Sequence, residues 1–283
     1  MIPSAENFYD LFGGGGSIVE AACRFQENGL FEQGQKWKHI HYNELNTGVY
    51  LLNKAIWEGT FDFDKARRTW ISRERFFAEK DEPTAWGAFV RFCWSFGGGG
   101  DMYIYGKEIE NTRNLQHLLT LMDWVPGETQ NEKRLFLRKE IGKVLKNHKQ
   151  LQSLQRLERL QSLERLERLE SLEGLQRLES LERLERVNKT NKDYRDVPIE
   201  PNSVVYCDIP YEGSGKCYGV NFDFAGFYEW SKTREFPVYH SGYMCSDPFF
   251  KLTWEKVTQC RMSKKDGKGI YKTEKLFWNG RKL

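Results

Sequence analysis

The chain has 283 residues, of which 39% are hydrophobic and 29% charged, and its formal net charge is +3. This composition is typical of a soluble globular protein and excludes a disordered chain. No stretch of about 18 apolar residues is present, which excludes a transmembrane helix, and the N-terminus has neither a basic start nor an apolar run, so we expect no secretory signal. The six cysteines never fall into Cys-x-x-Cys spacing, which argues against the usual zinc motifs and against a dense disulfide framework. A reducing compartment is therefore expected, and no metal site.

Basic residues gather in two separate places. Residues 133–149 hold seven Lys/Arg and one acidic residue, and residues 263–283 hold seven Lys/Arg and two acidic residues. Two basic clusters on a nearly neutral chain favour a polyanion such as nucleic acid as a partner, and the alternative is two solvated faces. In the first cluster, apolar and basic positions alternate at helical spacing. This pattern predicts a helix that presents Lys139, Lys143 and Lys146 on one side.

The first elements alternate between strand and helix. An aromatic run over residues 7–12 predicts a strand, four glycines follow, and Ser17 is placed to cap a helix. A second strand is predicted over 38–43, followed by an amphipathic helix through Val49, Leu52 and Ile56. This β-α-β-α order is typical of a parallel sheet. Later expected elements are a helix at 84–94 and strands at 203–207, 236–240 and 273–278.

A leucine repeat interrupts the chain at residues 151–187. Leucine recurs at every third position from Leu151 to Leu184, twelve times in all. Because an α-helix turns about 100° per residue, leucines at this spacing circle the helix and do not form one stripe, so a normal coiled coil is excluded. We interpret the repeat as a low-complexity, helical insertion that carries no chemistry.

The turn after the first predicted strand, Asp10-Leu11-Phe12-Gly13-Gly14-Gly15-Gly16, is the first candidate site. Glycines between a strand and a helix let a ligand approach the backbone closely, because no Cβ stands in the way. A P-loop needs a lysine that this turn lacks, and a dinucleotide motif needs a glycine where Val19 stands. A site for S-adenosylmethionine needs neither, and a simple tight turn is the alternative.

Glu44 follows the second predicted strand. A carboxylate at that place can accept two hydrogen bonds from a ribose diol. Its alternative role is that of an acidic group at a helix N-terminus, where the helix dipole favours negative charge.

The second candidate site is Asp208-Ile209-Pro210-Tyr211, at the carboxyl end of an apolar strand. Asp208 and the Ile209 carbonyl can accept the two N–H groups of an aromatic amine, which frees its lone pair for methylation. Pro210 stiffens the turn, and Tyr211 offers a flat face to an extruded base. The alternative is a strand that ends in an ordinary Asx-type turn.

Together these motifs resemble those of the Dam-type (alpha-order) DNA adenine methyltransferases, particularly the compact phage-like members of that family. Phe12-Gly13-Gly14-Gly15-Gly16 is similar to the family's Phe-x-Gly-x-Gly cofactor motif, and residues 208–211 resemble its Asp-Pro-Pro-Tyr motif, with Ile209 in place of the first proline. Residues 44–46, 95–106, 238–243 with Trp254, and 274–277 resemble further segments. The resemblance covers most of residues 7–125 and 197–279. The chain begins almost at the cofactor motif, so the family's usual N-terminal segment is expected to be missing.

The resemblance implies an α/β, Rossmann-like methyltransferase fold, with a mostly parallel sheet, an antiparallel last strand and an inserted helical recognition region. It divides the chain into a cofactor-binding part (1–105), a target-recognition insertion (106–196) and a catalytic part (197–283). It also implies S-adenosylmethionine as cofactor, DNA as partner and a cytoplasmic location in a bacterial or phage-infected cell. The catalytic residues it implies are Asp208, Ile209, Pro210 and Tyr211. The cofactor-binding residues it implies are Tyr9, Asp10, Phe12, Gly14, Gly16, Glu44 and Asp208.

Three functions stay open at this point. The first is methylation of the adenine amino group in DNA, with Lys139, Lys143 and Lys146 on phosphates. The second keeps the chemistry but takes cytosine or RNA as substrate. The third is a DNA-binding protein without catalytic activity.

Overall fold

The computed structural model describes residues 2–27, 37–96, 100–121, 129, 132–137, 139, 184, 186–212, 222–265 and 268–283. The chain divides into two compact units, one of Met1–Gly59 with Ser180–Leu283 and one of Thr60–Glu179. We call them the sheet unit and the helical unit. The sheet unit is built from two separate stretches of sequence, so the helical unit is an insertion between strands. The functions that the sequence assigns to residues 1–105, 106–196 and 197–283 stay predictions.

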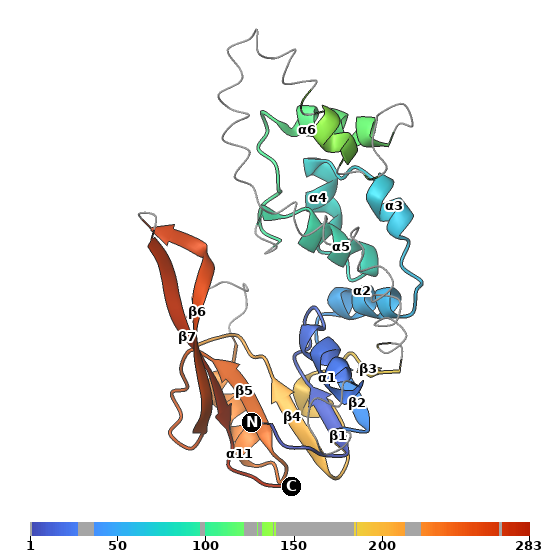
Figure 1. The fold of residues 1–283 in the computed structure, drawn as a ribbon. Coiled ribbons are helices and arrows are strands. Elements are labelled where there is room, and N and C mark those ends of the chain that lie inside the picture. The colour runs from blue at the N-terminus through green and yellow to red at the C-terminus, as the bar shows by residue number, and fades with distance from the viewer. Residues whose placement is uncertain are drawn as a thin grey trace. The chain divides into compact units, whose positions relative to one another are not determined.

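The sheet unit carries a seven-stranded sheet of strand order β3-β2-β1-β4-β5-β7-β6 (Figure 1). The pairs from β3 to β5 are parallel, and β7 runs antiparallel to both β5 and β6. This confirms the predicted α/β class, with a mostly parallel sheet, an antiparallel end and a helical region between strands. The strands are β1 (Asn7–Asp10), β2 (His39–Asn43), β3 (Asn188–Thr190), β4 (Ser203–Cys207), β5 (Val238–Gly242), β6 (Lys251–Lys265) and β7 (Lys268–Trp278).

The strand order reverses between β1 and β4. From β1 the chain moves outward to β2 and β3, and it returns on the other side of β1 as β4 and then β5. The register pairs Asp10 of β1 with Tyr206 of β4. In open α/β sheets, ligands bind outside the carboxyl ends of the strands at such a reversal. The two candidate motifs of the sequence directly follow β1 and β4, so both lie at this point.

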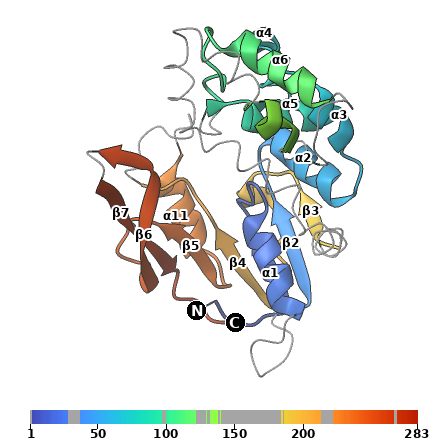
Figure 2. The same ribbon diagram turned by 45° about the horizontal axis from the view of Figure 1, so that its top comes forward.

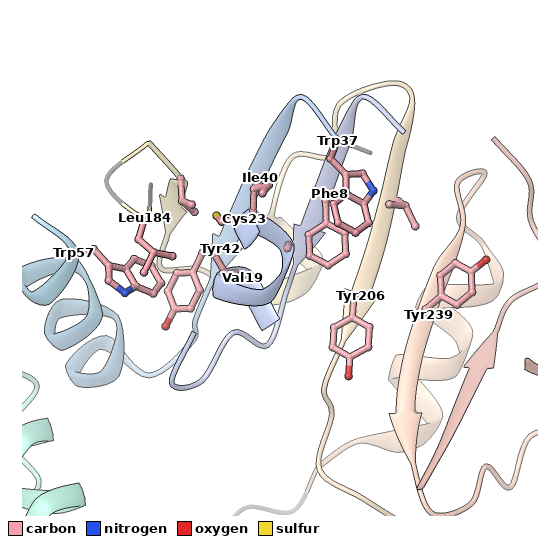
Figure 3. Packing of buried hydrophobic residues seen from close by; sticks show 13 residues of the cluster. Phe8, Val19, Cys23, Trp37, Ile40, Tyr42, Trp57, Leu184, Tyr206 and Tyr239 are labelled. Atoms are coloured by element: carbon pink, nitrogen blue, oxygen red, sulfur yellow. The ribbon is translucent and has the colours of Figure 1, made fainter. Parts of the chain in front are cut away.

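Helices cover both faces of the sheet, because alternate strand residues point to opposite sides. On one face, α1 (Ser17–Glu27) packs Val19, Ala22 and Cys23 against Phe8 and Tyr42 of the strands, as Figure 3 shows. On the other face, α11 (Phe224–Lys232) packs Phe227 and Tyr228 against a second apolar cluster. That second cluster includes Tyr9, Leu11, Val205, Cys207 and Val238.

The last leucine of the repeat belongs to the first of these cores. Leu184 is 5% exposed and lies in the cluster with Trp57, which ends α2 (Thr47–Trp57) (Figure 3). The repeat from residue 151 to residue 183 lies outside the described residues. Its end at Leu184 therefore has a structural role as part of the apolar core.

The β6–β7 hairpin is longer than the sheet that it closes. β5 pairs with β7 only from Gly242, opposite Lys275, to Tyr239, opposite Trp278. The pairing of β6 with β7 continues to Lys265, opposite Lys268. The ribbon therefore passes the carboxyl end of β5, as both views show (Figures 1 and 2).

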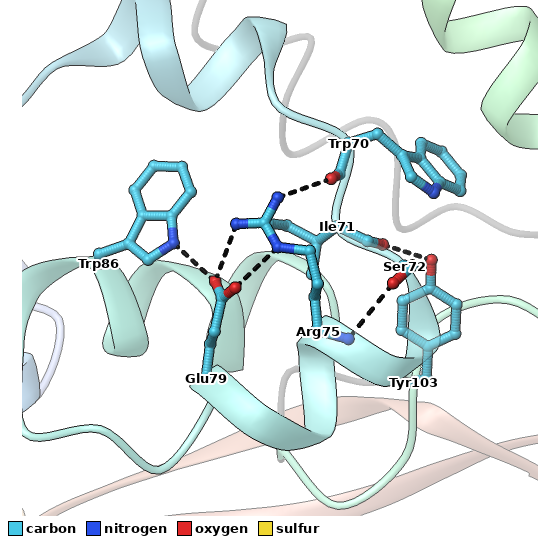
Figure 4. Close-up of polar contacts among 7 residues, drawn as sticks. All are labelled: Trp70, Ile71, Ser72, Arg75, Glu79, Trp86 and Tyr103. Atoms are coloured by element: carbon cyan, nitrogen blue, oxygen red, sulfur yellow. Dashed lines mark hydrogen bonds and ion pairs between the residues drawn. The ribbon is translucent and has the colours of Figure 1, made fainter.

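The helical unit includes four short helices among its residues up to 120. They are α3 (Phe63–Arg68), α4 (Arg73–Glu79), α5 (Ala85–Cys93) and α6 (Glu110–Thr120). Glu79 joins two of them, because its carboxylate accepts hydrogen bonds from Arg75 at 2.7 Å and from the Trp86 indole N–H at 2.8 Å (Figure 4). Tyr103 donates a hydrogen bond to the Ile71 carbonyl at 2.6 Å. These contacts tie α4 to α5 and to the segment after α5.

Most predicted elements occur where the sequence indicates them. The predicted helix at 84–94 is α5, and its side-chain cap is Thr84, which accepts a hydrogen bond from the Gly87 N–H at 3.0 Å. The sequence missed α3 and α4, because their short apolar patterns do not extend over two full helical turns. It also placed β5 two residues too early. In the described part of the chain, no helix is long and apolar enough to cross a membrane.

One capping prediction is wrong. The first intrahelical hydrogen bond of α1 runs from the Glu20 N–H to the Gly16 carbonyl at 2.9 Å, so Gly16 holds the capping position predicted for Ser17. Gly16 has a φ of 79°, a conformation that glycine adopts without a steric penalty. The last glycine of the turn is thus also the start of the helix.

Candidate active site

The glycine turn is held closed against β2 and α2. The Gly14 carbonyl accepts hydrogen bonds from the Tyr42 hydroxyl at 2.9 Å and from the Asn53 side chain at 2.6 Å. A Cβ at position 13 would lie 2.1 Å from the Tyr42 ring, so only glycine fits there. A Cβ at Gly15 would meet no atom within 4 Å. The turn is therefore packed from the protein side and open at Gly15.

Glu44 ties this turn to the end of β2. One carboxylate oxygen accepts the Gly14 N–H at 2.9 Å, and the other accepts the Asn46 N–H at 2.7 Å. Burial raises the pKa of Glu44, and the backbone hydrogen bonds oppose that shift. A carboxylate has about four acceptor positions, and the backbone N–H groups of Asn46, Gly14 and Leu45 take up no more than three of them. Glu44 precedes α2 by several residues, and Asn46 is the residue that caps this helix.

Asp10 is the most unusual group of the site. It is 1% exposed, and neither carboxyl oxygen has a hydrogen-bond partner within the described residues. Burial raises the pKa of Asp10 well above its usual value, and the nearby carboxylates of Asp208 and Glu44 raise it further. The nearby backbone N–H of Phe12 lowers the pKa of Asp10, although its position does not meet the geometry of a hydrogen bond. Buried carboxyls are normally paired, so Asp10 is suited to hold a cationic group of a ligand.

Asp208 lies one strand away, directly after β4. The Ser241 hydroxyl, near the end of the neighbouring strand β5, donates a hydrogen bond to Asp208 Oδ1 at 2.5 Å. Asp208 is exposed to solvent, yet protein atoms crowd its carboxyl group. The resulting desolvation raises the pKa of Asp208, and hydrogen bonds with Ser241 and Tyr211 lower it. Ser241 thus orients Oδ1 of Asp208, and Tyr211 lies close enough to interact with the same carboxyl group.

The Tyr211 side chain lies close to Asp208. It packs edge-on against Tyr243, with 4.7 Å between the ring centroids. Burial and the nearby charge of Asp208 raise the pKa of Tyr211 to about 12, so the phenol is protonated at neutral pH. The Lys272 ammonium lies 4.3 Å from the centroid of the Tyr243 ring. Tyr211, which interacts with Asp208, is therefore packed against a second aromatic ring.

Other residues predicted for the site have side chains that pack among the residues around it. Ile209 is 3% exposed and lies in the core beside α11. The Phe12 ring packs against Tyr194, with 5.2 Å between the centroids. The Tyr9 ring stacks on His41 at 3.9 Å, and its hydroxyl accepts the Glu200 N–H at 3.2 Å. The side chain of Tyr9 is thus used in packing, and the predicted part of Tyr9 in cofactor binding stays a prediction.

The three lysines predicted to contact nucleic acid belong to the helical unit. Lys139 is exposed and belongs to the helical unit. Lys143 and Lys146 lie outside the described residues. Their contact with nucleic acid stays a prediction.

Sequence reasoning did not name three residues that the structure brings to Asp208, to Tyr211 or to the ring beside Tyr211. They are Ser241, Tyr243 and Lys272, which come from the end of β5, the segment after it and β7. The signal available for Ser241 and Tyr243 was their place just after the strand predicted at 236–240. Lys272 had no such signal, because its approach depends on the hairpin register.

No protein-family profile and no curated protein sequence matches this chain. The functional argument therefore depends on the residues and their geometry.

Proposed function

We propose that this protein is a methyltransferase of Rossmann-like fold that methylates the exocyclic amino group of adenine in DNA, with S-adenosylmethionine as the methyl donor. One observation carries the proposal. The glycine turn with Asp10 and the Asp208 tetrapeptide follow neighbouring, paired strands at the point where the strand order reverses. A donor site and an acceptor site must be adjacent for group transfer, and this register brings the two motifs side by side.

The residues at the glycine turn fit the cofactor. The unpartnered, buried carboxyl of Asp10 matches the cationic ammonium of its methionine part. The remaining acceptor capacity of Glu44 matches a ribose hydroxyl, and the open position at Gly15 admits a ligand close to the backbone. When bound, the cofactor supplies an electrophilic methyl group on a sulfonium.

The tetrapeptide prepares the acceptor nitrogen. An exocyclic amine is a poor nucleophile, because its lone pair is delocalised into the ring. Asp208 and the Ile209 carbonyl accept its two N–H groups and favour a pyramidal nitrogen with a free lone pair. After transfer the nitrogen carries an extra proton, and a carboxylate with a raised pKa takes it up more readily. Tyr211 stacks on a base that has left the duplex.

A methylation assay tests the proposal. The full chain is incubated with duplex DNA and methyl-labelled S-adenosylmethionine, and the digested product is analysed by mass spectrometry. We expect labelled N6-methyladenine from the wild type and none from Asp208→Ala. The control is Asp196→Ala, an exposed carboxylate away from the site, which should label DNA normally. A wild type that labels no DNA, or an unchanged Asp208→Ala, would refute the proposal, and methylcytosine would change the substrate.

A further inference from the structure

The part of the β6–β7 hairpin beyond the sheet forms an arm, which we define as residues 256–274, of which the structure describes 256–265 and 268–274. β7 pairs with β5 only from Lys275 onward, so among the described strands the two strands of the arm pair only with each other. Because β7 is antiparallel to β5, the arm extends past the carboxyl end of β5. Asp208 and Tyr211 follow the carboxyl end of the adjacent parallel strand. The arm therefore rises from the same edge of the sheet as the candidate active site (Figures 1 and 2).

The foot of the arm contacts that site. Lys272 lies over the Tyr243 ring, and Tyr243 packs against Tyr211. Glu274, on the same face of β7 as Lys272, acts electrostatically on Tyr211. One face of the arm is thus turned toward the residues proposed to receive the base.

The arm also has the surface of a binding element. Val257 and Tyr271 are 63% and 65% exposed, and Trp254 at its foot is 46% exposed. The arm's sequence contains six Lys/Arg and two acidic residues. An isolated two-stranded ribbon is marginally stable in water, so exposed apolar and aromatic groups on it favour a partner. The excess of positive charge favours a polyanion.

We propose that the arm lies along duplex DNA beside the base to be modified, with its lysines on the phosphates. This inference rests on the proposed function, because it takes the same nucleic acid as partner. A two-stranded β-ribbon is narrow enough to enter the major groove, where basic side chains reach the phosphates on either side. The contacts predicted for Lys139, Lys143 and Lys146 belong to the helical unit and form no part of this proposal.

The salt dependence of DNA binding tests the arm. Binding of the full-length protein to a fluorescent 30-base-pair duplex is measured over a range of salt concentrations. Each phosphate contact contributes about 0.9 to the slope of log K against log salt. We expect Lys256→Gln to reduce that slope by about 1, and the triple variant Lys256→Gln, Lys264→Gln, Lys265→Gln to reduce it by about 3.

The matched control is Lys38→Gln, which removes an exposed charge next to the start of β2. Lys38 thus lies at the amino ends of the parallel strands, whereas the arm extends past their carboxyl ends. The control should leave the slope unchanged. Circular dichroism confirms that each variant is folded. Equal slopes for wild type, control and arm variants would overturn the inference, and so would equal competition by single-stranded DNA or RNA.

The assay separates this inference from the proposed function. Methyl transfer by the wild type together with unchanged slopes in the arm variants would overturn the arm alone. Reduced slopes in the arm variants without methyl transfer by the wild type would support the arm as a DNA contact and remove the proposed reaction.

Discussion

Carboxyl groups dominate the candidate site at the level of single residues. Asp10, Glu44 and Asp208 all have raised pKa values, and burial is the first cause in each case. A buried carboxyl without a partner destabilises the free protein when it ionises. An ionised Asp10 therefore does not stabilise the free fold, and its role in holding a ligand is part of the proposal.

Asp10→Asn should stabilise the free protein at neutral and higher pH. The pKa of Asp10 in the folded state is raised above 3.8, so the wild type loses stability as pH rises from about that value toward the folded pKa. Asparagine has no such loss. We expect a gain in the free energy of unfolding at pH 8, because asparagine does not ionise, and almost none near pH 4, where the buried carboxyl is neutral.

Urea unfolding at the two pH values measures this difference. Asp196→Asn serves as the surface control. A variant that is less stable than wild type at pH 8 would contradict the role assigned to the buried carboxyl. Calorimetry should also show weaker binding of S-adenosylmethionine to Asp10→Asn.

Ser241 should position Asp208 in the proposed reaction. Its hydrogen bond lowers the pKa of Asp208, and protonated Asp208 cannot accept the substrate N–H. In Ser241→Ala the acid limb of the pH–rate profile should therefore move to higher pH. The loss of one hydrogen bond, worth about 0.5–1.5 kcal/mol, should lower kcat roughly 2- to 10-fold at neutral pH.

Ser241→Thr retains the hydroxyl and should restore both the rate and the profile. A purely structural role for Ser241 would lower the rate without moving the acid limb. That result would contradict positioning.

The glycine turn is the element on which the proposed cofactor site depends. Gly16 has a φ of 79°, and a Cβ there would lie 2.4 Å from the Trp57 ring. Gly16→Ala should therefore reduce the free energy of unfolding by about 1–3 kcal/mol, the usual effect of overpacking, with backbone strain in addition. Gly15→Ala is the matched control, because a Cβ at Gly15 meets no atom within 4 Å.

Chemical denaturation of the two variants provides the comparison. Gly15→Ala should stay within about 0.5 kcal/mol of wild type. If both substitutions had equal effects, the turn would not have the geometry described. Comparing the rate of methyl transfer by Gly15→Ala with that of the wild type would in addition show whether a ligand approaches position 15 closely enough for a methyl group to hinder it.

The whole molecule has two compact units that should respond differently to the cofactor. All the residues proposed to hold S-adenosylmethionine belong to the sheet unit. Calorimetry should show two unfolding transitions, as multidomain proteins often do. Cofactor at 100 times its Kd should stabilise only the sheet unit, by about 2.7 kcal/mol.

Asp10→Asn at the same cofactor concentration is the control for this shift. Its sheet-unit transition should move less than that of the wild type. A cofactor that raises both transitions equally, or raises only the transition of the helical unit, would contradict the assignment.

Much of the fold could be predicted because the signals are local. The glycines of residues 13–16 mark a turn in any context, and the apolar run at 203–207 indicates a buried strand through its residue types alone. Both candidate motifs follow such strands. For that reason the sequence alone indicates Asp10, Glu44 and Asp208 as candidates.

Which residues become neighbours in space could be established only from the three-dimensional structure. Strand pairing joins residues that are remote in the chain, and no local period encodes which strands become adjacent. Tertiary packing thus brought Ser241 to Asp208, and the antiparallel register brought Lys272 to Tyr243 and directed the arm past the end of β5. Local sequence determined the elements and the chemical groups of this protein, whereas long-range pairing determined which groups act together.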